Sequence, residues 1–423
     1  MPYVLLASGL LVLLTAINAV RPRRGLVSLV PSFFAAWLTI ELAPWVLVLE
    51  ALVTALLVAG GGLDGLPGWL GLAATVAGWA GLALVMVRAR RTTLTVREWS
   101  AELDPGERAP AFPRSQVVFP FLMTRRRGVT RVRDIAYGDD PRMLLDVYKP
   151  SEPGELRPGI MEIHGGAWVI GSKREQGIPL LNHLAANGWV GINVDYRLSP
   201  QVTFPSHLVD LKRAIKWYRD HAEEHGADPG FLCVTGGSAG GHLAALVALT
   251  ANVPDYQPGF EDVDTSVRAA VPFYGVYDMR ALLDRASRHF ASFLERKVMG
   301  AARADDPEAY ARASPEHWIR EDAPPFLVVH GDLDTLVPVA QARSFTERLR
   351  RTSAAPVLYA EMKGAQHAFD IFPSYRAARV IEGTERFLAS VRRGERHPAV
   401  GTPQDTGHHA SPDMGRSGHG RGS

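Results

Sequence analysis

The sequence predicts an α/β fold, a mostly parallel sheet flanked by helices, preceded by an N-terminal region of transmembrane helices. From about residue 131, short apolar runs alternate with amphipathic helical patterns, which indicates a parallel sheet covered on both faces. The first 90 residues are instead strongly apolar, as bilayer-spanning helices are. We therefore expect a transmembrane region over 1–91, a juxtamembrane linker or cap over 92–130, the α/β domain over 131–393 and a disordered tail over 394–423.

Composition excludes some functions. The 46 basic and 44 acidic residues give a net charge of +2, which offers no reason to expect nucleic acid as a partner. The single cysteine, Cys233, excludes an intramolecular disulfide, and its apolar neighbours predict a buried structural thiol. The tail histidines lack the cysteines or fixed spacing of a metal site; they are His397, His408, His409 and His419.

Two uncharged apolar runs, residues 3–20 and 69–87, are each followed by arginines. Each has about the length of one membrane-spanning helix. A cleaved signal peptide fits the first run poorly, because its positive charge follows the apolar stretch and no A-x-A-like cleavage site ends it. We therefore expect uncleaved membrane anchors.

The apolar stretch between them, residues 26–59, is interrupted by Pro31, Glu41, Pro44 and Glu50. As one continuous helix it would be about 50 Å long, too long for one upright span. Both arginine clusters share the cytoplasmic side only if this stretch crosses once. We expect an interfacial piece near 31–41, a span over 45–59 and three spans in all, with the N-terminus outside and the domain after Arg91 in the cytoplasm. The expected location is the plasma membrane. Alternatively, the two glutamates mark a functional site within the membrane.

Seven strands and several helices are predicted in the α/β domain. One clear amphipathic helix has Leu208, Leu211, Ile215 and Tyr218 on a single face. The strand candidates are residues 144–148, 160–163, 190–195, 232–235, 269–273, 326–329 and 357–361.

Residues 236–240 read Gly-Gly-Ser-Ala-Gly, directly after a strand run and directly before a helical pattern. This is the context of a nucleophile elbow, in which a sharp turn exposes a reactive serine. The serine oxygen then stands at a helix N-terminus, where backbone N–H groups favour developing negative charge. Ser238 is therefore the predicted nucleophile.

Residues 164–168 read His-Gly-Gly-Ala-Trp after the strand at 160–163. A tetrahedral oxyanion needs preorganised N–H donors, which consecutive glycines after a strand can turn inward. We assign Gly165 and Gly166 to this oxyanion hole, with Ala239 as a further donor. His164 is expected to orient or pack, not to act as a base.

The acid and the base are expected in loops after later strands, at the sheet edge where open α/β sheets gather their sites. Asp334 and His367 follow two such strands, and the order Ser238, Asp334, His367 matches the Ser…Asp…His order of this type of site. Asp332 is a rival acid. His242, just after the elbow, is expected to pack or make a polar contact.

With these motifs in place, the sequence resembles the alpha/beta hydrolase fold-3 and hormone-sensitive-lipase-like carboxylesterases over most of residues 131–392. The matching motifs include Leu-Asp-Val-Tyr at 145–148, His-Gly-Gly at 164–166 and Asp-Tyr-Arg-Leu-Ser-Pro at 195–200. The resemblance implies an α/β-hydrolase fold, cleavage of carboxylic esters without metal or cofactor, a structural role for 195–200, and Asp334 as the acid. Membrane spans replace the usual N-terminal cap, and the segment 277–325 is short for an elaborate lid.

The expected function is thus that of a membrane-anchored carboxylesterase or lipase acting on small-molecule or lipid esters. Amidase, formamidase or acyltransferase activity would use the same triad, and an inactive membrane scaffold would need none of it. We also hypothesise that residues 92–133 hold the pocket mouth near the bilayer, with a cap over the site as the alternative. This segment combines Arg125, Arg126, Arg127, Arg131 and Arg133 with Phe112, Val117, Val118, Phe119, Phe121, Leu122 and Met123.

Overall fold

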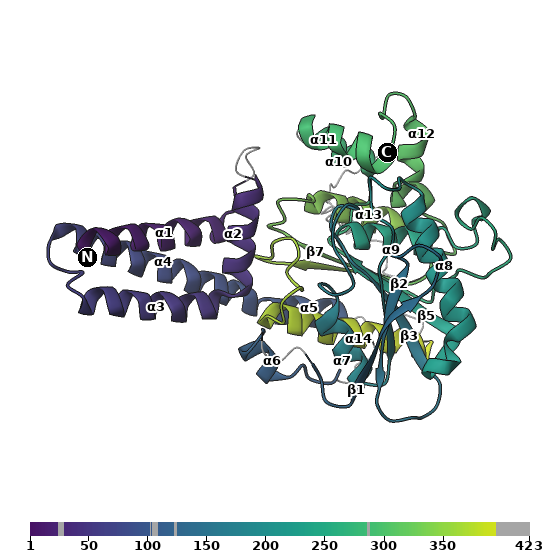
Figure 1. Ribbon diagram of the computed structural model, residues 1–423, viewed down its shortest axis with the longest axis horizontal. Coiled ribbons are helices and arrows are strands. Elements are labelled where there is room, and N and C mark those ends of the chain that lie inside the picture. Colours follow the sequence, from purple (N-terminus) through teal and green to yellow (C-terminus); the bar gives the residue numbers. More distant parts are fainter. Residues whose placement is uncertain (24–28, 102, 104–108, 122–124, 286–287, 395–423) are drawn as a thin grey trace, which may run out of the picture.

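A bundle of apolar helices projects from a large α/β domain (Figure 1). The computed structural model describes residues 1–23, 29–101, 103, 109–121, 125–285 and 288–394. Leu122, Met123 and the tail histidines, which entered the predictions above, lie outside these ranges. The bundle helices are α1 (Pro2–Val20), α2 (Leu29–Glu41), α3 (Ala43–Ala59) and α4 (Leu66–Arg90).

Helices α1, α3 and α4 lie side by side, and α2 runs across their ends next to the α/β domain (Figure 1). Within the described ranges, Pro2–Val20 and Leu66–Ser100 are long and apolar enough to cross a membrane. Helices α2 and α3 meet at 92°, so this bent pair counts as a third span only when its two parts are taken together. The N-terminus and the α3–α4 loop share the end of the bundle far from the α/β domain (Figure 1).

Small residues hold α1 and α4 together. A Cβ atom placed on Gly71 of α4 would lie 2.6 Å from the backbone of Leu5 and Leu6 in α1, so the two helices touch backbone to backbone, as helices in membranes often do. The outer surface of the bundle is apolar: Leu11 is 62% exposed and Leu56 is 73% exposed. An apolar surface on this scale is unfavourable in water and suits a lipid environment.

The α/β domain is built on one eight-stranded sheet with the order β1-β2-β4-β3-β5-β6-β7-β8. Strands β1 and β2 are antiparallel to their neighbours, and the pairs from β4 through β8 are parallel. The strands are β1 (Val129–Ala136), β2 (Leu144–Pro150), β3 (Arg157–Ile163), β4 (Val190–Val194), β5 (Ala227–Gly237), β6 (Ala270–Phe273), β7 (Phe326–Gly331) and β8 (Val357–Met362).

All seven predicted strands are present, and β1 is the strand that the sequence prediction missed. This strand lies at the sheet edge, has no fully buried residue, and contains Arg131, Arg133 and Asp134. A partly exposed edge strand lacks the continuous apolar run by which buried strands are recognised.

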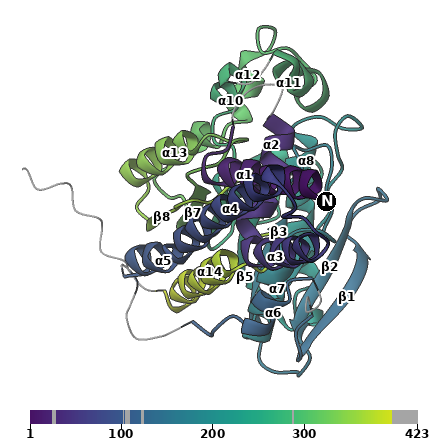
Figure 2. The same ribbon diagram turned by 90° about the vertical axis from the view of Figure 1, so that its left-hand side faces the viewer.

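Helices cover both faces of the sheet (Figures 1 and 2). One core contains apolar residues of α8 (Ser206–His221), α9 (Ala239–Leu249) and α13 (Val339–Thr352). The other contains residues of α5 (Thr92–Ser100), α7 (Ile178–Ala186) and α14 (Tyr375–Arg393). The predicted apolar face of α8 is buried, with Leu208, Leu211 and Ile215 at 0% exposure and Tyr218 at 1%.

Shorter helices complete the chain. Helix α6 (Arg114–Val118) lies in the linker, and α10 (Met279–Arg285), α11 (Arg288–Phe293) and α12 (Pro307–Arg312) lie between β6 and β7. The linker is partly integrated into the α/β domain, because Trp99 of α5 and Phe112 are buried in its core. Phe112 also stacks on His183, with ring centroids 5.5 Å apart.

Candidate active site

The turn between β5 and α9 holds Ser238 in a strained conformation, with φ 59° and ψ −119°. Residues other than glycine rarely adopt a positive φ, and residues in such strained conformations are found most often at functional sites. Two backbone hydrogen bonds hold the turn: Ser238 N donates to Phe273 O at 3.0 Å, and His242 N donates to Ser238 O at 2.9 Å. The sharp turn places the serine at the N-terminus of α9.

The glycines of the elbow allow this close packing. A Cβ atom on Gly236 would lie 2.5 Å from Ile163 O, and one on Gly240 would collide with the same carbonyl oxygen. Any side chain at either position would push the elbow away from the end of β3. The two glycines of the Gly-x-Ser-x-Gly motif are therefore required by the short distance between β3 and α9.

His367 and Asp334, which follow β8 and β7, form a buried hydrogen-bonded pair. His367 Nδ1 lies 2.6 Å from Asp334 Oδ2. The other carboxylate oxygen, Oδ1, accepts hydrogen bonds at 2.8 Å from Leu336 N and from Val337 N. The carboxylate is therefore fixed from both sides, and it directs the far ring nitrogen of His367, Nε2, away from itself.

A second histidine also contacts the acid. His330 Nε2 lies 3.0 Å from Val337 O and 3.3 Å from Asp334 Oδ2. Burial alone would raise the pKa of Asp334, but the charge of His367 and hydrogen bonds from His330 and His367 outweigh it and hold the pKa below its usual range. Asp334 is therefore ionised near neutral pH.

Asp332, the other candidate acid, contacts residues other than His367. Asp332 Oδ1 accepts from Gly364 N at 2.7 Å, and its Oδ2 lies 3.7 Å from Lys363 Nζ. Of the two candidate acids, Asp334 is the one hydrogen-bonded to His367.

Tyr274 connects the histidine to the elbow. Its ring centroid lies 4.5 Å from that of His367, and its hydroxyl lies 2.6 Å from where a Cβ on Gly237 would stand. Ser238 makes no side-chain hydrogen bond within the described ranges. Catalytic hydrogen bonds are often long or poorly aligned without substrate. Tyr274 thus lies between the loop that carries His367 and the elbow that carries Ser238.

The loop after β3 lies against the serine but departs from its prediction. A Cβ on Gly165 would stand 3.0 Å from Ser238 Cβ. However, Gly165 N donates to Gln176 Oε1 at 2.7 Å, so this N–H is not free to bind an oxyanion. Gly166 and Ala167, with φ of 121° and 50°, donate to no other residue of the described chain through their N–H groups.

Ala167 was not among the predicted donors, because the availability of its N–H depends on backbone direction, which residue types alone do not reveal. Ala239 is the first residue of α9, where N–H groups have no partner within the helix. The chain therefore offers Gly166, Ala167 and Ala239 as donors near the serine.

Two further histidines are structural, as predicted. His164 is fully buried, stacks on Tyr196 with ring centroids 4.5 Å apart, and has Nδ1 2.7 Å from Gly165 O. His242 Nδ1 accepts from Trp168 Nε1 at 3.2 Å, and its Nε2 lies 2.7 Å from Ala313 O. Burial lowers the pKa of each histidine to about 4, so both are neutral.

Cys233 is also as predicted. It is a free and fully buried thiol, and burial raises its pKa. It therefore lacks the thiolate character of a reactive cysteine.

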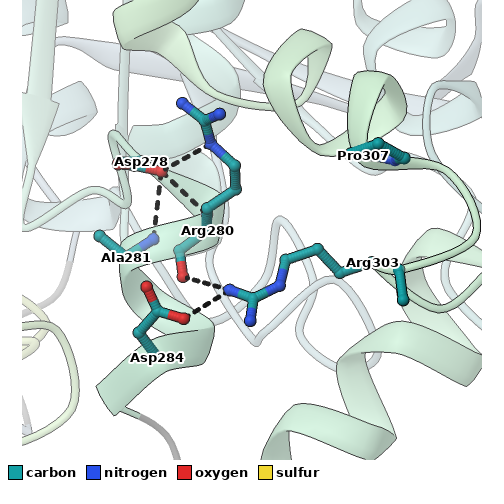
Figure 3. A pocket seen from close by; sticks show the side chains of 7 residues that line it. Asp278, Arg280, Ala281, Asp284, Arg303 and Pro307 are labelled. Atoms are coloured by element: carbon teal, nitrogen blue, oxygen red, sulfur yellow. Dashed lines mark hydrogen bonds and ion pairs between the residues drawn. The ribbon is translucent and has the colours of Figure 1, made fainter.

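A surface hollow of about 580 Å³ lies between α10 and α12 (Figure 3). Its charged groups already pair with each other: Arg303 Nη1 lies 2.5 Å from Asp284 Oδ1, and Arg280 Nε lies 3.8 Å from Asp278 Oδ1. The residues of the serine, histidine and aspartate loops do not line it.

Comparison with known proteins agrees with this geometry. Residues 145–349 match the family described as BD-FAE. The chain is 47% identical to a probable carboxylic ester hydrolase, LipM, of Mycobacterium tuberculosis over 64% of either chain, so the match spans just under two thirds of that relative. It is 42% identical to the esterase LipQ of the same organism over 68% of this chain and 69% of LipQ.

A solved structure shares the fold. The butyrate-bound esterase Est2 of Thermogutta terrifontis matches with a TM-score of 0.52 and 28% identity, over 63% of this chain and 95% of that one. The fold prediction is thus confirmed. This chain belongs to the α/β-hydrolase family, among relatives that are carboxylic ester hydrolases.

Proposed function

We propose that this protein is a membrane-anchored serine carboxylesterase that acts through an acyl-enzyme on Ser238. The observation that carries the proposal is the 2.6 Å hydrogen bond between His367 and Asp334 on loops that meet the strained serine elbow. His367 takes the proton of the Ser238 hydroxyl as its oxygen attacks the ester carbonyl, then delivers this proton to the departing alcohol. Asp334 keeps the histidine in the required tautomer and stabilises its charged form.

Deacylation reverses these roles. A water molecule attacks the acyl-enzyme while His367 accepts its proton, and the carboxylic acid leaves as the serine is reprotonated. We assign the oxyanion to the N–H groups of Gly166, Ala167 and Ala239. Gly165 is replaced in this set because its N–H is bonded to Gln176.

The test is labelling with a fluorophosphonate, which reacts with activated serines. Wild type is expected to be labelled at one site, and Ser238→Ala is expected to lose that label. Ser206→Ala is the matched control, since Ser206 begins α8 and stands outside the relay. Labelling that persists in Ser238→Ala would remove this serine from its assigned role.

The same relay can serve an amidase or an acyltransferase. Paired ester and amide substrates with the same acyl group, and a competing alcohol acceptor, separate these activities. We expect faster turnover of the ester and release of free acid as the main product, because the relatives are named as ester hydrolases.

The membrane part of the proposal rests on the apolar bundle. We assign α1, α3 and α4 as three spans, with the N-terminus outside and the α/β domain in the cytoplasm. Arg88 Nη1 donates to Val20 O at 2.9 Å, so the arginine-rich end of α4 meets the end of α1 on the side of the α/β domain. This arrangement agrees with the tendency of basic residues to remain inside.

Topology can be tested with single cysteines, since the one native thiol is buried. In intact cells, a membrane-impermeant maleimide should label Asp64→Cys in the α3–α4 loop. Lys216→Cys in α8 should react only after permeabilisation. The reverse pattern would overturn the proposed orientation.

We also propose lipid-derived or membrane-dissolved esters as substrates. Phe121 is 59% exposed beside Phe372, and Phe119 contacts Trp45 at the start of α3. This part of the linker thus presents aromatic side chains next to the bundle, where interfacial aromatics favour membrane contact. If a full-length Phe121→Ser variant kept the same relative efficiency as wild type on liposome-embedded and soluble esters, this part would fail.

A further inference from the structure

One face of α2 packs along the loop that carries His367, the candidate base. Phe33, Trp37 and Glu41 are spaced four residues apart, so they line a single face of this helix. We call these three residues the α2 stripe. It faces the segment from His367 to Arg376, which connects β8 to α14.

The first half of the stripe contacts the histidine and its neighbour. The Phe33 ring meets the His367 ring edge-on, with centroids 6.2 Å apart. The Trp37 indole N–H donates to Ala368 O at 2.8 Å, and its ring stacks on Phe372 at 5.0 Å. Two adjacent residues of the histidine loop are therefore held by α2.

The backbone at this point needs such support. Ala368 has φ 61°, an unfavourable conformation for a residue with a Cβ atom. Strained residues persist where surrounding contacts fix them. The hydrogen bond from Trp37 acts on the carbonyl of this strained residue, directly after His367.

The last residue of the stripe holds the far end of the loop. Ser374 Oγ donates to Glu41 Oε2 at 2.6 Å and also accepts from Ala377 N, which caps α14. Glu41 Oε1 lies 3.6 Å from Arg376 Nε. The Arg376 guanidinium is fully buried, and its nitrogens have no hydrogen-bond partner within the described ranges, so the Glu41 carboxylate is its nearby opposite charge.

We propose that the α2 stripe is a positioning surface for the His367 loop, so that turnover depends on a helix of the membrane region. The stripe fixes both ends of the loop and its strained residue, and thereby the direction of the His367 ring. This inference rests on the proposed function, because it assigns the stripe to the orientation of the base.

The test removes one contact at a time. Trp37→Phe keeps an aromatic ring but loses the N–H donor to Ala368. Leu38→Ala on the same helix is the matched control, since Leu38 is 40% exposed. Full-length proteins are compared with a soluble short-chain ester, and kcat is expressed per site labelled by fluorophosphonate at the end point, which corrects for any inactive fraction.

Trp37→Phe is expected to lower kcat per labelled site by roughly 10- to 100-fold, since small displacements of catalytic groups cost rates of this order. KM should change less than about twofold, because the stripe acts on the base and not on ground-state binding. Leu38→Ala should match wild type in both. A merely structural role would reduce the labelled fraction and leave kcat per site unchanged.

Unchanged kcat per labelled site in Trp37→Phe would overturn the inference. If that variant does not fold, Phe33→Leu decides by the same criterion, because it removes the ring contact to His367. Failure of the proposed function looks different: wild type itself would then lack a label that depends on Ser238.

Discussion

Replacing Asp334 by asparagine tests the relay most directly. The carboxylate accepts on both oxygens: Oδ1 from two backbone N–H groups, and Oδ2 from His367 Nδ1 at 2.6 Å. Asparagine has the same shape but carries one NH₂ group. If its oxygen keeps the two backbone N–H groups, its NH₂ faces His367 and requires Nδ1 to accept.

The expected loss follows from this change of tautomer. With Nδ1 as acceptor, the proton of neutral His367 moves to Nε2, the nitrogen that must take the proton of the serine. An equivalent tautomer error in a serine-histidine-aspartate triad costs roughly 10⁴-fold in kcat, or about 5 kcal/mol of transition-state stabilisation. We expect a loss of this order in Asp334→Asn.

The measurement is kcat/KM for a soluble ester together with the rate of fluorophosphonate labelling, and both should fall. Asp332→Asn is the control, because Asp332 contacts Gly364 and Lys363 and should change kcat less than about threefold. An Asp334→Asn enzyme that keeps a tenth of the activity, or a larger loss in Asp332→Asn, would refute the assignment of the acid.

Three further predictions concern packing and pH. Gly240→Ala should destabilise the fold by about 1–3 kcal/mol and slow fluorophosphonate labelling, because the added Cβ collides with a β3 carbonyl. Gly230→Ala is the control: its Cβ would meet only a flexible side chain at 3.2 Å, so the thermal midpoint should change little. Gly71→Val should lower the unfolding temperature in detergent by forcing α4 from α1; an unchanged midpoint would contradict this packing. The hydrogen bond from Arg343 lowers the pKa of Glu361 to about 2, so Glu361 stabilises the fold above its unfolded pKa near 4.5, and this contribution disappears as the pH falls toward 2. Glu361→Gln should therefore be less stable than wild type at pH 6, with a gap in denaturant midpoint that narrows below about pH 4.5 and closes near pH 2. A gap independent of pH would contradict this prediction.

The parts of the fold that could be predicted from the sequence are those that depend on local residue patterns. The buried parallel strands are continuous apolar runs, and the loops after them carry the chemically distinctive residues. Ser238, Asp334 and His367 were predicted as site residues because each follows such a run, and parallel strands bring their carboxyl ends to one sheet edge. The structure gathers these loops there, with Asp334 bonded to His367.

The sequence could not predict features that depend on the direction of a backbone N–H group or on the exposure of an edge strand. Strand β1 has polar residues at a sheet edge, so its pattern is weak. In the loop after β3, two adjacent glycines look equivalent in sequence. The carbonyl oxygen of the Gln176 side chain occupies the N–H of Gly165, and this contact leaves Gly166 and Ala167 as donors.

The contact between α2 and the histidine loop could not be predicted for a further reason. Trp37 and Ala368 are 331 positions apart, and the sequence of α2 by itself resembles an ordinary interfacial or membrane helix. Its apolar residues would suit lipid equally well, but Glu41 would not, because a carboxylate in an apolar environment requires a partner. The partners are Ser374 and Arg376, so the polar residue that interrupts the apolar stretch marks where the N-terminal helical bundle meets the loop of the candidate base.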